Sequence, residues 1–396
     1  MKNLRLTGRR AFLLGLSASA ATGACAISNP YRQLNNKVQA TVDDKRDFTV
    51  SGDTPLRDRA AAKGLIYGAA AGYQILSSDT AFADSFAKEC AILVPPNALK
   101  FRVLRPTPTR FDFTEGDALL EFARKHNMLF RGHTLVWGQD FSNFGSQWLK
   151  NTVNSQNAEQ VLINHIQTVV GHYAGKIHSW DVVNEAIEPR HGRADGLAKT
   201  PWLEFIGPDY LDIAFRTAAE IDPKAMLVLN VTEYDIGENA AQREARRIAA
   251  LKLLEHLKSQ GTPIHALGIQ AHLEGITTHF NPRRLKAFLR DVASLGLKIL
   301  ITEMDVIDNQ LPLNIDIRDR IVAGVYEDYL SVVLEEPAVI AVLTWGLSDR
   351  DTWHSTWNPR ADKAPVRPLP LDTQLKRKLA WNAIARVFDR MPERKI

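Results

Sequence analysis

Short apolar runs alternate along the chain with longer segments that have helical periodicity. Eight apolar runs have the length of strands, at residues 65–70, 91–94, 128–136, 177–184, 225–230, 266–273, 298–306 and 339–345. Each run is nearly continuous instead of alternating with polar residues, which is typical of parallel strands buried on both faces. The pattern therefore predicts eight parallel strands.

The segments between the runs predict helices. Residues 157–173 repeat apolar side chains every 3.6 residues, and residues 241–259 and 282–294 behave similarly. Gly261 and Gly296 follow the last two segments, where helices commonly end. Eight strands that alternate with helices favour a barrel or a doubly wound sheet. No Gly-x-Gly-x-x-Gly follows the first run, which weighs against a dinucleotide-binding sheet. We expect the α/β class and a (β/α)8 TIM barrel.

The domain organisation is predicted to be simple. Residues 1–26 combine a basic start, the pair Arg9-Arg10, an apolar stretch at 11–21 and a small-residue end, as in export signals. The arginine pair indicates the twin-arginine route, to the periplasm or the extracellular space. Residues 27–52 are polar and without periodicity, which predicts a flexible tether. A single catalytic domain is expected over residues 53–390.

The chain has only two cysteines, Cys25 and Cys90, which excludes a disulfide framework and a cysteine-based zinc site. Cys25 leaves open a lipid anchor, although Thr22 stands where a lipobox carries an apolar residue. Cys90 is expected to be a small core residue.

Charge and hydropathy exclude two classes of partner. The net charge is +4 over 396 residues, and the charged residues are scattered, so no basic stripe indicates nucleic-acid binding. Beyond the N-terminus, no apolar run is long enough to span a membrane. We expect a monomer that needs no cofactor and no metal.

Polar side chains end five of the eight runs. In a (β/α)8 barrel the active site lies at the carboxyl ends of the strands. Ionisable groups beside buried strands are costly unless they are paired or used. The side chains at these ends are His133, Trp137, Asn184, Glu185, Gln270, His272, Glu303, Asp305 and Trp345.

Two of these side chains suit the cleavage of a glycosidic bond. Glu185 and Glu303 end the fourth and seventh runs, on opposite sides of the barrel mouth. Retaining glycosidases need two carboxyls about 5–5.5 Å apart, one protonated and one ionised. Asn184 is placed to bind a sugar 2-hydroxyl, and a His272–Asp305 pair is placed to keep Glu303 anionic.

Three tryptophans lie near these polar ends: Trp137, Trp345 and Trp353. They are either core residues or platforms for sugar rings. Pyranose faces are apolar and large aromatic rings offer matching surface, which favours substrate binding for all three.

Taken together, these motifs resemble glycoside hydrolase family 10, the endo-β-1,4-xylanase family of (β/α)8 barrels, over residues 54–388. The motifs that carry the resemblance are GHTLVW at 132–137, WDVVNEA at 180–186, GIQAH at 268–272, ITEMD at 301–305 and TWGLSD at 344–349.

The resemblance implies a role for individual residues. Glu185 matches the acid/base and Glu303 the nucleophile, and Asp305 supports His272. The implied substrate contacts are Asn97, Lys100, His133, Asn184, Tyr234, Gln270, His272, Trp345 and Trp353, with Tyr234 on the aglycone side.

Two departures from the family pattern fall on the glycone side. Pro96 stands where the family carries a glutamate that binds the −2 sugar, and Gly138 stands where it commonly carries a histidine. A charge-assisted hydrogen bond is worth roughly 1.5–3 kcal/mol, so affinity for the −2 sugar is expected to fall about tenfold or more.

The leading hypothesis is a secreted retaining endo-1,4-β-xylanase that cleaves internal bonds of xylan by double displacement. One alternative is a relative with altered specificity, for β-glucan or a decorated xylan, motivated by Pro96 and Gly138. The other is a non-catalytic secreted carbohydrate-binding protein. The intact set of polar residues at the strand ends argues against this second alternative.

Overall fold

The computed structural model describes residues 45–232, 240–276 and 281–394. Within these ranges, eight parallel strands close into a barrel in the order β10-β1-β2-β3-β5-β6-β7-β9, and β10 pairs with both β1 and β9. The barrel strands are β1 Ile66–Ala70, β2 Ile92–Val94, β3 Leu129–Gly132, β5 Ser179–Asn184, β6 Met226–Val231, β7 Ala266–Ile269, β9 Lys298–Ile307 and β10 Val339–Thr344. The predicted (β/α)8 barrel is confirmed.

Two of the predicted strands are each divided in two. The run at 128–136 ends as β3 and resumes as β4 Val136–Trp137, and the run at 266–273 ends as β7 and resumes as β8 His272–Glu274. Between β7 and β8, Ala271 has a φ of 61°, which a strand does not accommodate. The two breaks fall beside His133 and His272, at the mouth of the barrel.

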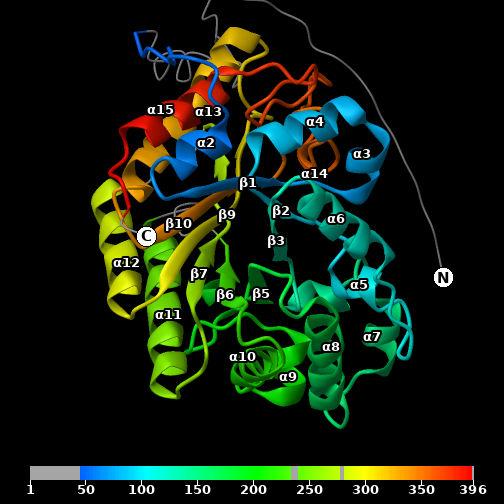
Figure 1. Ribbon diagram of the computed structural model, residues 1–396. Helices are drawn as coiled ribbons and strands as arrows, with labels where there is room; N and C mark the ends of the chain where they lie inside the picture. The colour runs from blue at the N-terminus through cyan, green and yellow to red at the C-terminus, as the bar shows by residue number, and fades with distance from the viewer. Residues whose placement is uncertain (1–44, 233–239, 277–280, 395–396) are drawn as a thin grey trace, which may run out of the picture.

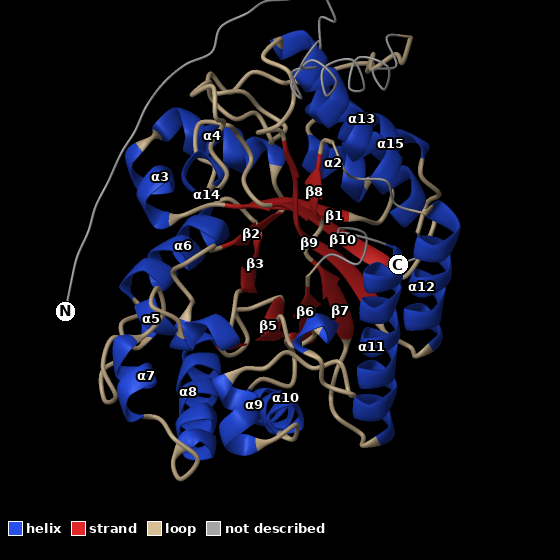
Figure 2. Cartoon of the chain, turned by 180° about the vertical axis from the view of Figure 1, so that it is seen from behind, coloured by secondary structure: helices blue, strands red, loops and turns tan. Residues whose placement is uncertain are grey.

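Helices form an outer layer around the strands (Figures 1 and 2). They are α2 Leu56–Ala61, α3 Tyr73–Ser78, α4 Thr80–Glu89, α5 Phe101–Leu104, α6 Thr114–Lys125, η1 Gly138–Phe141, α7 Gln147–Thr152, α8 Ala158–Tyr173, η2 Pro189–His191, α9 Pro201–Ile206, α10 Tyr210–Ile221, α11 Ala240–Ser259, α12 Pro282–Ser294, α13 Ile315–Val333, α14 His354–Trp357 and α15 Leu379–Arg390. The three helices predicted from periodicity are α8, α11 and α12.

The ends of α12 illustrate how the sequence sets the helix boundaries. Asn281 caps the start, because its side-chain oxygen accepts the N–H groups of Arg283 and Arg284. Gly296 follows the end with a φ of +76°, and Gly261 follows α11 with a φ of +68°. These left-handed conformations suit glycine and stop both helices where the sequence predicts.

Two apolar layers hold the barrel together. Small and branched side chains fill its interior, among them Val228, Leu300 and Leu343. A much larger layer lies between the strands and the helices and contains the fully buried Trp180 and Cys90. The close packing of both layers makes the strand ends a rigid support for the active site.

Residues 45–52 pack against the helices around the barrel, and the rest of the predicted tether, residues 27–44, lies outside the described residues. Arg46 donates to the carbonyl of Gly324 and to Asp328 on α13. Phe48 is 5% exposed, with the Arg320 guanidinium 5.6 Å from its ring centroid. The buried ring of Phe48 and the hydrogen bonds of Arg46 hold this stretch against α13.

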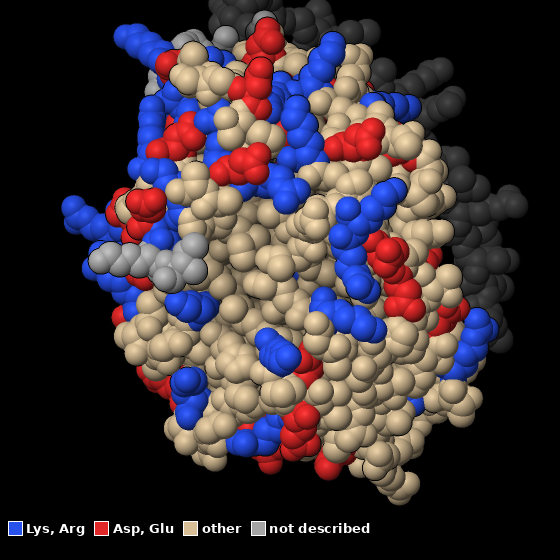
Figure 3. Space-filling view, viewed as in Figure 1, with Lys and Arg blue, Asp and Glu red and all other residues tan. Residues whose placement is uncertain are grey.

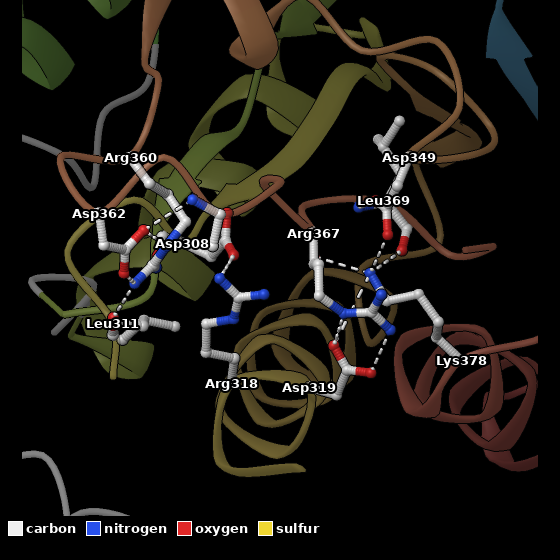
Figure 4. Close-up of polar contacts among 11 residues, drawn as sticks. Asp308, Leu311, Arg318, Asp319, Asp349, Arg360, Asp362, Arg367, Leu369 and Lys378 are labelled. Carbon is white, nitrogen blue, oxygen red and sulfur yellow. Dashed lines mark hydrogen bonds and ion pairs between the residues drawn. The ribbon is translucent and has the colours of Figure 1, made fainter. Parts of the chain in front are cut away.

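The long segment after β10 is held by one buried and one half-buried ion pair (Figure 4). Lys378 donates to Asp349 at 2.8 Å, and Arg367 makes a two-bond contact with Asp319 on α13. Such paired charges orient the loop that carries Trp345 and Trp353.

Charged side chains of both signs lie on the surface of the protein. In the view of Figure 3, basic and acidic side chains are intermixed and form no stripe of one sign. No helix among the described residues has both the length and the apolar character that crossing a bilayer requires.

Candidate active site

A cavity of about 1390 Å³ opens at the carboxyl ends of the strands. It brings together the residues that the sequence singled out. Those that line it are Asn97, Lys100, His133, Trp137, Asn184, Glu185, Gln270, His272, Glu303, Trp345 and Trp353. Asp305 is fully buried behind His272, and Tyr234 lies outside the described residues.

Glu303, near the middle of β9, is 4% exposed and is surrounded by donors and cations. Its Oε1 accepts the Asn230 amide at 2.7 Å, and its Oε2 lies 3.3 Å from Nε2 of His272. Burial raises the pKa of Glu303, but the positive charge of His133, the hydrogen bond and charge of His272, and Lys100 outweigh it and lower the pKa to about 2. Glu303 is therefore an ionised carboxylate at neutral pH.

Glu185 follows β5 in a different environment. Its Oε2 accepts the indole N–H of Trp137 at 2.8 Å, and its Oε1 accepts the Gln270 amide at 3.0 Å. The residue has a φ of 59°, which is rare for a side chain other than glycine and typical of residues held in place for function. The carboxyl is half-buried and contacts neutral donors, whereas Glu303 is buried beside two histidines and Lys100.

A chain of amide hydrogen bonds connects the two glutamates. Gln270 Nε2 reaches both Glu185 and, at 3.4 Å, Oδ1 of Asn184. Asn230 Nδ2 donates to the same Asn184 oxygen at 2.9 Å and to Glu303. Because Oδ1 of Asn184 accepts these bonds, the group that Asn184 offers to a ligand is its Nδ2 donor.

The orientation of the Asn230 amide is fixed by Thr302. Its Oδ1 accepts the hydroxyl of Thr302 at 2.7 Å, so its Nδ2 faces the carboxylate. Gly268 makes room for this contact, because a Cβ there would lie 2.4 Å from Oδ1 of Asn230. The glycine of the GIQAH motif is thus explained by the amide beside it.

His272 connects Glu303 to a buried acid. Its Nδ1 lies 2.9 Å from Oδ1 of Asp305, while its Nε2 faces Glu303. Oδ2 of Asp305 accepts the indole N–H of Trp353 at 2.9 Å and lies 2.8 Å from Nε2 of His354. Burial raises the pKa of Asp305, but the charges and hydrogen bonds of His272 and His354 hold it well below the usual range. A permanently charged Asp305 thus orients both the histidine and the tryptophan.

Removing His272 is expected to shift the pH dependence of activity. The ionised form of Glu303 is the one stabilised in the folded protein, and His272→Ala removes one source of that stabilisation, so its pKa rises. We predict that the acidic limb of kcat/KM moves up by roughly one pH unit or more. The limb is measured with a soluble aryl glycoside, and His256→Ala, an exposed histidine on α11, is the control. An unmoved limb in His272→Ala would contradict the electrostatic role.

A buried ion pair that sequence reasoning did not single out lies behind His133. Asp181 accepts a hydrogen bond from Arg131 and lies 2.9 Å from Nδ1 of His133. Trp345 meets the His133 ring edge to face, with centroids 5.1 Å apart. His133 is thereby held between Asp181 and Trp345, with its Nδ1 4.0 Å from Glu303.

Asn230 and His354 were also missed as site residues. Asn230 carried a signal, since it ends the fifth apolar run in the same way that the other polar residues end theirs. Asp181 also indicated a buried polar cluster, because an acid within a buried run needs a partner. His354 carried none, because its place beside Asp305 depends on the fold of the segment after β10.

Asn97 and Lys100, in the segment after β2, form part of the cavity wall. The ammonium of Lys100 lies 4.8 Å from the centroid of the Trp137 ring, a cation–π contact. Oδ1 of Asn97 accepts a hydrogen bond from Arg102 at 2.9 Å. Pro96 lines the cavity beside them and offers no hydrogen-bonding side chain.

The turn after Trp137 explains the glycine at position 138. A Cβ on Gly138 would lie 2.5 Å from Cγ2 of Thr200, so the neighbouring loop occupies the space that a side chain would need. Asp140, two residues on, lines the cavity at 2% exposure, and burial raises its pKa to about 7 despite Lys100 and a backbone hydrogen bond from Trp137.

Among the described residues, no group of three or more histidine, cysteine, aspartate or glutamate side chains is arranged to bind a metal. The arrangement is a pair of carboxyls, one buried among cations and one bound by neutral donors. The two carboxyls thus differ in burial and in the groups that bind them.

Comparison with known proteins agrees with this chemistry. The family model described as Glycosyl hydrolase family 10 matches residues 55–387. Endo-1,4-beta-xylanase B of Thermotoga neapolitana is 32% identical over 311 residues, covering 76% of this chain and 84% of the relative. Exoglucanase XynX of Acetivibrio thermocellus is 31% identical over 368 residues, which are 90% of this chain but 32% of that relative's length.

Solved structures give the same result. Native xylanase 10B from Thermotoga maritima superposes with a TM-score of 0.75 at 30% identity, covering 85% of this chain and 98% of that one. Xylanase 10B from Thermotoga petrophila in complex with xylobiose gives 0.76 at 29% identity, covering 86% and 99%. The chain belongs to glycosyl hydrolase family 10.

Proposed function

We propose that this chain is a retaining endo-1,4-β-xylanase with Glu303 as nucleophile and Glu185 as acid/base. The observation that carries the proposal is the contrast between the two carboxyls. Glu303 is buried among His133, His272 and Lys100, which keep it anionic. Glu185 is half-buried and accepts hydrogen bonds from two neutral donors.

The first step forms a covalent intermediate. A carboxylate oxygen of Glu303 attacks the anomeric carbon while the bond from that carbon to the glycosidic oxygen breaks. The carboxylic acid of Glu185 transfers its proton to that oxygen, so the leaving chain departs as an alcohol. Nδ2 of Asn184 donates to the oxygen of the sugar 2-hydroxyl and so positions the ring for the transition state.

The second step releases the product. Glu185, now a carboxylate, takes a proton from water, and the hydroxide oxygen attacks the anomeric carbon from the face that the leaving group vacated. The ester bond to Glu303 breaks, and both carboxyls return to their initial states. Two inversions at one carbon give net retention of the β-configuration.

Xylan is proposed as the substrate because the relatives named above include xylanases, one of them solved in complex with xylobiose. A second candidate is a β-1,4-glucan or a decorated xylan. Pro96 favours it, since the wall next to Asn97 lacks an acceptor for sugar hydroxyls, and one relative is named an exoglucanase.

Release of reducing sugar distinguishes these substrates. We expect the purified protein to release sugar from beechwood glucuronoxylan faster than from arabinoxylan and at least about tenfold faster than from barley β-glucan. The Glu303→Ala variant is the blank. A dominant rate on β-glucan would replace the xylanase proposal with the glucanase, and binding to xylan without release by any preparation would support a non-catalytic protein.

We further propose that residues 1–26 direct export by the twin-arginine route. Replacing both Arg9 and Arg10 with lysine is expected to leave the full-length protein in the cytoplasm, as measured by activity in cell fractions. Export of the double variant at the normal level would argue for another route. Replacing Cys25 with serine tests lipid anchoring, because release of a membrane-bound fraction would reveal an acylated cysteine.

A further inference from the structure

Two large aromatic side chains at the edge of the cavity have no part in the mechanism above. Phe144 is 71% exposed and Trp357 is 59% exposed, yet both line the cavity that contains the catalytic glutamates. Their rings meet edge to face, with centroids 5.6 Å apart and planes at 82°. Exposed apolar rings that converge at the rim of a binding cleft mark a place where a ligand buries them.

The two rings come from loops that follow different strands of the barrel. Phe144 lies between η1 and α7, in the segment that follows β4, whereas Trp357 is the last residue of α14, after β10. Trp357 stands four residues after Trp353, about one helical turn or 5.4 Å further along. Trp353 contacts the ring of His272 beside the nucleophile, so Trp357 extends the same wall away from the reacting bond.

The position of Phe144 is fixed by contacts with the predicted glycone wall. Arg102 donates from Nη2 to Asn97 at 2.9 Å and from Nη1 to the carbonyl of Phe144 at 3.4 Å. Gly145, next in the chain, packs so closely that a Cβ there would lie 2.1 Å from the carbonyl oxygen of Asp140. Phe144 is thus held on a tight turn beyond Asn97, and little ordering is needed when a ligand binds.

We propose that Phe144 and Trp357 form an additional sugar-binding position on the glycone side, which holds the third xylose from the cleaved bond. This inference rests on the proposed xylanase function. A xylopyranose presents C–H groups on both faces and packs well on an aromatic ring, and an edge-to-face pair leaves ring faces open to receive it. The position also offsets the weak second site, where Pro96 offers no hydrogen bond.

Aryl xylosides of two lengths test the proposal. An aryl xylobioside fills two glycone positions, and an aryl xylotrioside fills the third as well. In Trp357→Ala, we expect kcat/KM for aryl release from the xylotrioside to fall about tenfold, equivalent to about 1.4 kcal/mol, and that for the xylobioside to change less than about twofold. Phe144→Ala is expected to act in the same direction, and product chromatography confirms that cleavage occurs at the aryl bond.

Matched variants separate the aromatic contact from a general effect. Trp357→Phe keeps an aromatic face and is expected to retain most of the rate on the longer substrate, whereas Trp357→Leu keeps bulk and is expected to lose it. Leu313→Ala, at a residue 64% exposed and outside the residues that line the cavity, is the surface control.

Each outcome bears on a different claim. Equal losses on both substrates, or a gain on the xylotrioside when the pair is removed, would overturn the additional position and show that the pair supports the loops or obstructs the cleft. Absence of aryl release by the unmodified protein from either xyloside would instead overturn the xylanase function on which the inference rests.

Discussion

The Glu303→Ala variant is expected to lose hydrolysis of an aryl xylobioside by a factor of about 10⁴ to 10⁶ in kcat, as is typical when a covalent nucleophile is removed. Without the carboxylate, the anomeric carbon has no group positioned to attack it, and the surrounding histidines and Lys100 are left without the anion that they stabilise. Substrate affinity is expected to change far less, because the walls at Trp137 and Trp345 are untouched.

Glu115→Ala provides the matched control for this variant. Glu115 lies in the first turn of α6 and also lines the cavity, but it has no part in the proposed mechanism. It is expected to keep kcat within about twofold of the unmodified protein, as for most surface substitutions. Residual turnover above about 1% in Glu303→Ala would contradict a nucleophilic role.

The second large effect is expected in Glu185→Ala, and it depends on the leaving group. Xylan and xylosides of alcohols need a proton on the departing oxygen, so their hydrolysis is expected to fall about 10³-fold or more. Dinitrophenolate is a good leaving group that departs without that proton. The first step on a dinitrophenyl xylobioside is therefore expected to proceed nearly unchanged. The glycosyl-enzyme then accumulates, because no base activates water.

Azide provides the decisive comparison for Glu185→Ala. As an anion it needs no general base, so it is expected to attack the accumulated intermediate, restore turnover of the dinitrophenyl substrate and yield a β-xylobiosyl azide, identified by NMR. Glu185→Gln, which keeps the side-chain volume, is expected to behave similarly. Equal losses for good and poor leaving groups, without rescue by azide, would exclude Glu185 as the acid/base.

Much of this architecture follows from the order of apolar runs. Eight buried runs of strand length, separated by helical periodicity, are nearly sufficient for a barrel, since each parallel strand needs a crossover helix. The site follows from the same pattern, because strands that close a barrel bring their carboxyl ends together. Glu185 and Glu303, 118 positions apart in the printed sequence, meet in one cavity for that reason.

Most of the features that the sequence did not predict depend on loops. The sequence gives no period for the segment after β10, so neither the contact of His354 with Asp305 nor the pairing of Trp357 with Phe144 was predictable from it. Asn230 could have been predicted, because it ends the fifth apolar run in the same way that Asn184 ends the fourth. The breaks after β3 and β7 could not be predicted from the apolar pattern, because the apolar runs continue through them.

The site combines a fixed anion with a network of oriented amides. Asn230 is oriented by Thr302, and it in turn donates to Asn184 and Glu303. Preorganised donors of this kind stabilise charge in the transition state without reorganisation during the reaction. In the proposed mechanism, the amide chain lets two carboxyls on different strands act on one sugar.

Trapping the glycosyl-enzyme tests the central claim most directly. A 2-deoxy-2-fluoro xylobioside with a dinitrophenyl leaving group slows the second step more than the first, so the intermediate persists. The account predicts that the intact protein gains the mass of one fluoroxylobiosyl group and that peptide mass spectrometry places it on Glu303. Attachment to any other residue, or turnover of the parent substrate with inversion and no adduct, would contradict the account.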